Sequence, residues 1–102
     1  RGMNAEAIAA LTKAVELRPM YAMAHQNLGA FLLDAGDLEA AVDHLLTAQS
    51  LDPQNVTIFL NLGLALEREG NVTDARRAYE RALQLEPENA FAIDRVKNLN
   101  QQ

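Results

Sequence analysis

The sequence predicts an all-α fold in which antiparallel helical hairpins stack on one another to give six helices. The first observation behind this prediction is a period, because Pro19, Pro53 and Pro87 are spaced 34 residues apart. The second is the composition: 49% of the 102 residues are apolar, and most of these are Ala and Leu, which favour helices over sheets. Only three Pro and five Gly are present, which suits long helices with short connections.

Further columns of identical residues repeat at the same spacing. They are Gly2, Gly36 and Gly70; Ala7, Ala41 and Ala75; Ala14, Ala48 and Ala82; and Leu17, Leu51 and Leu85. Residues 22–55 and 56–89 align without a gap and share ten identities in 34 positions. We therefore expect residues 1–102 to form a single array: the second helix of a partial unit (1–21), two complete repeats (22–55 and 56–89) and a C-terminal capping helix (90–102).

The first helix of each complete repeat is predicted over residues 22–35 and 56–69. Asn55 and Asn89 each lie two residues after a Pro, where an Asn side chain can cap the helix that begins next. Apolar residues recur at helical spacing in both helices. They are Leu28, Phe31 and Leu32 in one, and Phe59, Leu62 and Leu66 in the other. Gly29 and Gly63 lie inside these helices, where Gly costs about 1 kcal/mol relative to Ala, so we expect a neighbouring helix to cross closely there.

The second helix of each repeat is predicted over residues 38–51 and 72–85. Gly36 and Gly70 end the preceding helix, because Gly adopts left-handed backbone angles cheaply, and Asp37 and Asn71 are suitable caps for the next one. A face of small residues seven apart allows the two helices of a hairpin to approach closely. It consists of Ala41 and Ala48 in one repeat and of Ala75 and Ala82 in the other, with Leu45 or Tyr79 filling the space between the helices.

These columns resemble the tetratricopeptide repeat family over essentially the whole chain. The family pattern of large residues, Leu-Gly, Ala and Pro is met by Phe59, Leu28, Gly29, Leu62, Gly63, Leu32, Leu66, Ala41, Ala75, Tyr79, Ala48, Ala82, Pro53 and Pro87. The sequence departs from the pattern at His25, where the family has a large residue, and at Leu45, where it has an aromatic one. The resemblance implies a right-handed superhelix whose first helices line a concave groove.

The two ends of the array differ in kind. Residues 4–17 are expected to be a second helix without its first, so the face with Ala7, Leu11 and Ala14 is uncovered. This suggests either a fragment of a longer array or a face covered by another chain. Residues 90–100 are expected to form a last first-type helix with Ile93 and Val96 in phase, and Lys97 in the Gly position indicates a solvating cap.

The resemblance implies which residues face the groove. They are Met23, Gln26, Asn27, Ala30, Leu33, Asp34, Thr57, Leu60, Asn61, Leu64, Glu67, Arg68, Phe91, Asp94, Arg95 and Asn98. The peptide-binding candidates among them are Met23, Asn27, Thr57, Leu60, Asn61, Leu64, Arg68, Phe91 and Arg95. Asn27 and Asn61, one period apart, either hold the backbone of an extended peptide or support the hairpin by local hydrogen bonds. The apolar candidates, with Leu33, either contact a partner or pack between neighbouring first helices.

One binding mode of the family grips the acidic C-terminus of chaperones with two Lys, two Asn and an Arg. At the corresponding places this sequence has Gln26, Ala30, Asn61, Phe91 and Arg95, so both Lys are missing and this mode is disfavoured.

Nothing in the sequence indicates catalysis. There is no Cys, no Gly-rich phosphate loop and no metal-ligand spacing, and we expect neither a metal nor a cofactor. His25 and His44 are isolated along the chain, and His25 occupies a packing position, which favours a buried structural role. The net charge is −5 without a basic stripe, which argues against nucleic acid, and no apolar run approaches the ~20 residues that span a bilayer.

The sequence therefore predicts a scaffold or adaptor, not an enzyme, whose partner is another polypeptide, an extended peptide or a helix, bound in the concave groove. One alternative is a self-association module acting through the N-terminal helix face. Another is the accessory substrate-binding array of a larger enzyme such as a glycosyltransferase. The compartment stays open, with a cytoplasmic location slightly favoured.

Overall fold

The computed structural model describes residues 2–101, and the side chains from residue 4 onward. The described chain forms six α-helices: α1 (Gly2–Leu17), α2 (Ala22–Ala35), α3 (Leu38–Leu51), α4 (Val56–Arg68), α5 (Val72–Leu85) and α6 (Ala90–Asn100). No strand occurs within these residues. Four of the six helices have the predicted bounds, while α1 begins two residues earlier than expected and α4 ends one residue earlier.

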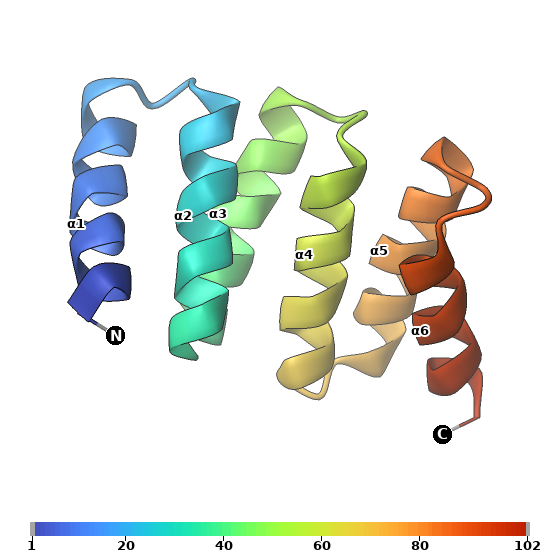
Figure 1. Ribbon diagram of the computed structural model, residues 1–102. Coiled ribbons are helices and arrows are strands. Elements are labelled where there is room, and N and C mark those ends of the chain that lie inside the picture. Colours follow the sequence, from blue (N-terminus) through green and yellow to red (C-terminus); the bar gives the residue numbers. More distant parts are fainter. Residues whose placement is uncertain (1, 102) are drawn as a thin grey trace.

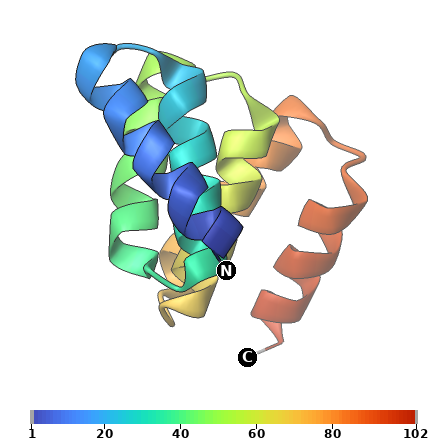
Figure 2. The same cartoon turned by 60° about the vertical axis from the view of Figure 1, so that its left-hand side comes forward.

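The helices stack side by side into an elongated array of 40 × 26 × 19 Å (Figure 1). Helices α2 and α3 form one antiparallel hairpin, and α4 and α5 form the next. Each hairpin packs on its neighbour mainly through the contact between α3 and α4, with a smaller contact between α2 and α4. Helix α1 packs on α2 and α6 packs on α5, so each end of the stack is a single helix (Figure 2).

Two apolar clusters hold the stack together. The N-terminal core is built from α1 to α5, and its buried residues include Leu28, Leu32, Leu33, Leu45, Leu62 and Ala65. The C-terminal core joins α4, α5 and α6, and its buried residues are Phe59, Ala75, Tyr79, Ala82, Ala92 and Leu99. Because α4 contributes to both clusters, the two complete hairpins share one continuous interior.

The two helical glycines lie where the helices of each hairpin cross. A Cβ atom at Gly29 would stand 2.6 Å from Leu45 Cγ, and one at Gly63 would stand 2.7 Å from Tyr79 Cε1. Real Cβ atoms do not approach other heavy atoms so closely, so only Gly fits without a shift of the neighbouring side chain. The predicted close crossing is confirmed, as is the role of Leu45 and Tyr79 as its filling residues, both 0% exposed.

The helix ends follow the predicted chemistry with one exception. Gly36 and Gly70 have φ values of 86° and 85°, in the left-handed region that Gly tolerates. The Asn71 side chain accepts a hydrogen bond from the Asp74 amide at the start of α5. The side chains of Asn55 and Asn89 likewise accept from the Thr57 and Ala92 amides at the starts of α4 and α6. Asp37 occupies the N-cap position of α3, but its side chain makes no capping hydrogen bond, so this part of the prediction was wrong.

Helix α6 is rotated relative to the expectation. Its inward face contains Ala92, Val96 and Leu99, with Ala92 and Leu99 at most 1% exposed. Ile93, expected in phase with Val96, is 42% exposed, and that part of the prediction was wrong. Ala92, Val96 and Leu99 lie on one stripe of the helix, whereas Ile93 lies outside it. Only one face of α6 can pack on α5, and it is the face with Ala92.

Candidate peptide-binding surface

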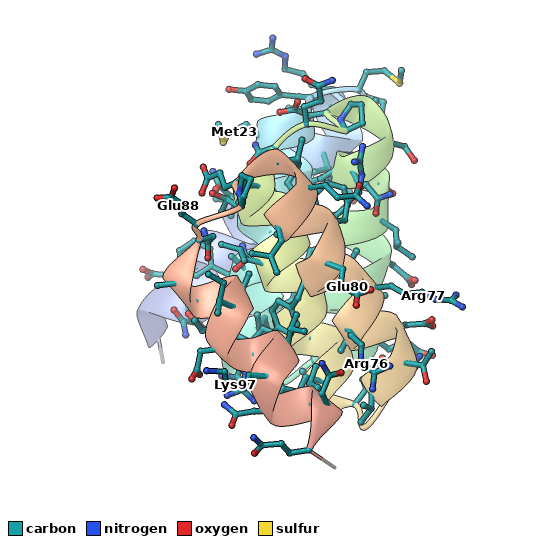
Figure 3. The ribbon with its side chains drawn as sticks, turned by 90° about the vertical axis from the view of Figure 1, so that its right-hand side faces the viewer. Met23, Arg76, Arg77, Glu80, Glu88 and Lys97 are labelled. Atoms are coloured by element: carbon teal, nitrogen blue, oxygen red, sulfur yellow. The ribbon has the colours of Figure 1, made fainter. Side chains whose placement is uncertain are left out.

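The sequence-predicted groove residues come from α2, α4 and α6. The exposed ones are Met23, Asn27, Thr57, Arg68 and Phe91, and the partly buried ones are Leu60, Asn61, Leu64 and Arg95. We refer to these nine exposed and partly buried residues as the first-helix surface. Figure 3 shows Met23, which belongs to this surface, on one side of the stack and Arg77 on the other.

The apolar candidates separate into two groups. Leu33 is 4% exposed and belongs to the N-terminal core, so for this residue the packing interpretation is correct. Leu60 and Leu64 are partly buried against the two cores. Met23 and Phe91 are 47% and 44% exposed, which leaves them available to a partner. A ring edge of Phe91 packs on Tyr79, with ring centroids 6.0 Å apart, so this aromatic is held in place by the C-terminal core.

Asn27 and Asn61 make no side-chain hydrogen bond with any other residue in the range 2–101. The structure thus offers no sign of the local bonds that would explain both residues as hairpin supports. The neighbouring amide behaves differently: Gln26 is buried and accepts a hydrogen bond from Asn55 Nδ2 at 3.0 Å. Both Asn side chains therefore have a donor and an acceptor that no described residue engages.

Arg95, the cation expected to face the groove, is held by a carboxylate of the protein itself. Its Nε donates to Glu67 Oε1 at 3.1 Å, and its Nη2 forms an ion pair with Glu67 Oε2. The Tyr79 hydroxyl donates to Glu67 Oε1 at 3.0 Å. Burial, followed by the hydrogen bond and negative charge of Glu67, raises the pKa of Tyr79, and the hydrogen bond with Glu67 raises the pKa of Arg95. This network joins α4, α5 and α6, and a ligand carboxylate would have to compete with Glu67 for Arg95.

His25 and His44, which are 19 residues apart in sequence, meet in the structure. Their Nδ1 atoms are 3.2 Å apart, and His25 Nε2 is 2.8 Å from the carbonyl oxygen of Pro19. A carbonyl only accepts, so His25 Nε2 carries a proton, and when the His25 ring is neutral its Nδ1 accepts from Nδ1–H of His44. The buried structural role predicted for His25 is confirmed, whereas the interpretation of the two residues as isolated was wrong. The alignment of the repeats could have indicated this pairing, because it places His25 and His44 in the two helices of one hairpin. Phe59 and Ala78 occupy the equivalent positions one repeat later.

The described residues contain no group of three His, Asp or Glu side chains placed to hold a metal ion. No helix among them is both long enough and apolar enough to cross a membrane.

The hairpins stack on one another, their helices cross closely at a Gly in each of two repeats, and the first helices present an exposed face. These features define a helical-repeat protein. The chain belongs to the tetratricopeptide repeat family, whose model matches residues 1–56 and 32–90. Solved structures of TPR proteins share its fold over nearly the whole of this chain. The TPR domain of Arabidopsis OM64 superposes with a TM-score of 0.94 at 27% identity, over 99% of this chain and 84% of that one. MamA gives a TM-score of 0.95 at 27% identity, over 98% and 58%.

Curated relatives are longer proteins. The small glutamine-rich tetratricopeptide repeat-containing protein 2 of Mycosarcoma maydis is 31% identical over 81% of this chain and 24% of its own length. The protein O-mannosyl-transferase TMTC1 of Mus musculus is 33% identical over 95% of this chain and 11% of its own length. The chain therefore spans less than a quarter of either relative.

Proposed function

We propose that this chain is a protein-interaction scaffold that binds a peptide or helix of a partner across the first-helix surface. The observation that carries the proposal is the pair of unengaged amides at Asn27 and Asn61, one repeat apart, together with the exposed side chains of Met23 and Phe91 on the first-type helices. Amides that both donate and accept can hold a peptide backbone, and the exposed apolar side chains give a partner contact area.

Structural neighbours support a polypeptide partner. The first TPR domain of Spaghetti (RPAP3), 24% identical with a TM-score of 0.94, was solved bound to the HSP90 peptide SRMEEVD. Acidic peptides of this kind suit a basic groove. Here Gln26 and Phe91 occupy the places where the family's chaperone clamp has Lys, and Arg95 is paired with Glu67. We infer that the partner is held by backbone hydrogen bonds and apolar contacts instead of by an acidic tail.

A selection from a random library of 12-residue peptides tests this function. Binders are expected to lose about tenfold in affinity to the Asn27→Ala/Asn61→Ala variant, since losing hydrogen bonds worth roughly 1.4 kcal/mol in total changes Kd tenfold. Arg77→Ala, on the opposite side of the stack, is the matched control and should bind normally. Equal affinity for the wild type and the double Asn variant would show that this surface is not the site.

A second candidate function is self-association through α1. Ala7, Leu11 and Ala14 are partly exposed, whereas their equivalents Ala41, Leu45 and Ala48 are 0% exposed. A second copy would bury this face. Light scattering over a range of concentrations, with Leu11→Glu as the comparison, measures it: a monomer at all concentrations removes this function for the chain.

The similarity to TMTC1 supports a third context, an accessory array of a larger transferase. The complete reading frame tests this directly, because a neighbouring catalytic domain must be encoded in it.

A further inference from the structure

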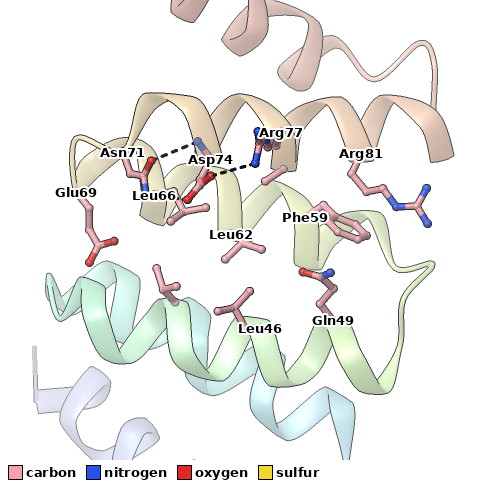
Figure 4. A pocket seen from close by; sticks show the side chains of 12 residues that line it. Leu46, Gln49, Phe59, Leu62, Leu66, Glu69, Asn71, Asp74, Arg77 and Arg81 are labelled. Atoms are coloured by element: carbon pink, nitrogen blue, oxygen red, sulfur yellow. Dashed lines mark hydrogen bonds and ion pairs between the residues drawn. The ribbon is translucent and has the colours of Figure 1, made fainter.

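A second groove lies between α3 and α5, with α4 as its floor (Figure 4). Its volume is about 540 Å³. This is within the range of roughly 300–1,000 Å³ typical of ligand sites, and it is enough to seat several side chains. The floor is apolar and consists of Leu66, which is partly exposed, and of Phe59 and Leu62, which are buried, while Leu46 of α3 stands over it with 47% of its surface exposed. We call this the second-helix groove.

The second-helix groove is separate from the first-helix surface. Helix α4 contributes Phe59, Leu62 and Leu66 to the groove, while the candidate residues Leu60, Asn61 and Leu64 do not line it. These two sets occupy opposite stripes of one helix. Figure 3 agrees, since Arg76 and Arg77 of α5 lie on the side of the stack away from Met23. A partner in this groove would leave the first-helix surface free.

The same place one repeat earlier, between α1 and α3 over α2, provides an internal comparison. There His25 takes the place of Phe59 on the floor, and His44 takes the place of Ala78 on the wall. A hydrogen bond between the two rings joins the floor to the wall. On the earlier wall Thr12 replaces the exposed Leu46, while Ile8 and Val15 replace Val42 and Gln49 and pack into the N-terminal core. The open apolar groove is therefore a property of particular side chains in this repeat and not of the repeating backbone.

The charges of the two places also differ. Asp43 and Thr47 in the earlier repeat correspond to Arg77 and Arg81 in the later one. Arg81 donates to Gln84 Oε1 at 2.7 Å, its guanidinium carbon lies 5.7 Å from the centroid of the Phe59 ring, and it makes no ion pair with any residue in the described part of the chain. Arg77 reaches Asp74 only at 3.8 Å, between two well-exposed side chains, which is a weak pairing. The α3 wall opposite is uncharged, with Val42, Leu46 and Gln49.

We propose that the second-helix groove docks an amphipathic helix of a partner protein, with its apolar stripe on Leu46 and Leu66 and with Asp or Glu side chains beside Arg77 and Arg81. The groove residues of α3 and α4 recur every three or four positions along their helices, which matches the spacing of the apolar stripe of a third helix. The two arginines on one wall select for acidic residues on one flank of that helix. Glu69 and Asp74 line the opposite end of the groove, so the acidic flank belongs at the Arg81 end.

The test is a phage-displayed library of 16-residue helix-forming peptides, randomised on one face and selected against the intact 102-residue chain. We expect binders with apolar residues at helical spacing and Asp or Glu on one flank. Leu46→Glu should weaken them at least about tenfold by placing a charge in the apolar groove. Arg77→Glu/Arg81→Glu should weaken them about fivefold at low salt and less at high salt, and should improve binding of peptides with Lys in place of the acidic residues.

Asn27→Ala/Asn61→Ala is the matched control and should bind these helices with unchanged affinity. Because all the substituted residues except Asn61 are exposed, circular dichroism should report an intact fold for each variant. The proposal is overturned if the library yields no binder, if binders are indifferent to Leu46→Glu, or if amide shifts map to Met23 and Asn27 instead of to Leu46 and Arg81. Concentration-dependent dimers that Leu46→Glu abolishes would also overturn it, by assigning the groove to a second copy. The peptide selection on the first-helix surface is independent of each of these results.

Discussion

His25 and His44 form a partly buried imidazole pair whose Nδ1 atoms are 3.2 Å apart, within one helical hairpin. Because His25 Nε2 is committed to the Pro19 carbonyl, the bond between the rings requires that one of the two Nδ1 atoms lacks a proton. A proton on both rings would place two Nδ1–H groups against each other. The stability of the hairpin should therefore depend on pH, although neither histidine has any role in the proposed binding.

The first prediction concerns stability against pH. Burial, followed by the charge of His25, lowers the pKa of His44 from 6.5, while Asp43 opposes this by raising it. Above pH 6.5 both folded and unfolded states are neutral at this position and nothing is lost. Below it the unfolded state binds the proton more readily, so stability falls as the pH drops from 6.5 toward the lowered folded value. The melting temperature should therefore be lower at pH 5.5 than at pH 7.5.

The next repeat supplies the control for that experiment. The variant His25→Phe/His44→Ala installs the side chains that occupy the equivalent places, Phe59 and Ala78. It should lose the decline in melting temperature between pH 7.5 and 5.5, because carboxylates titrate mostly below this range. An equal decline in the wild type and the variant would mean that the pair is not its source.

The second prediction concerns the helix crossing at Gly63. Gly63→Ala gains about 1 kcal/mol of helix propensity but drives a methyl group into the Tyr79 ring, with a cost of roughly 1–3 kcal/mol. We expect a net loss in urea denaturation. Ala30→Gly in α2 measures the propensity term alone and should cost about 1 kcal/mol. A Gly63→Ala variant more stable than the wild type would refute the steric reason for this Gly.

The third prediction compares two N-cap residues. Asn55 accepts from the Thr57 amide at 3.0 Å and donates to Gln26 and Asp52, so it ties the start of α4 to α2. Asn55→Ala should lower the free energy of unfolding by about 1–2 kcal/mol. Asp37→Ala should cost under about 0.5 kcal/mol, because Asp37 makes no capping bond. Equal losses in chemical denaturation would contradict this distinction.

The fourth prediction concerns Glu67. Glu67→Ala removes the acceptor of both Tyr79 and Arg95 and leaves a partly buried cation, which should cost about 1–3 kcal/mol. Asp74→Ala breaks only the long, exposed pair with Arg77 together with a bond to Asn71, and should cost less. Urea denaturation compares them. If Glu67→Ala lowered the free energy of unfolding by no more than Asp74→Ala, the network between α4, α5 and α6 would contribute no more than a surface ion pair.

The sequence by itself determined the helices of this protein. Periodic Pro, Gly and Ala residues act locally, through backbone angles, caps and small contact faces, so their spacing was enough to place every helix to within two residues. It also predicted a close helix crossing at Gly29 and Gly63, with Leu45 or Tyr79 filling the space between the helices, because these positions recur at one period.

Only the tertiary structure decided which side chains meet between helices. The pairing of His25 with His44, the capture of Arg95 by Glu67, and the burial of Ala92 instead of Ile93 depend on how each helix is rotated and on side-chain reach. The second-helix groove is lined by side chains of α3, α4 and α5, which only the packing of these helices brings together. A period of 34 residues fixes the backbone that these contacts share, whereas the contacts themselves arise from residues that do not repeat.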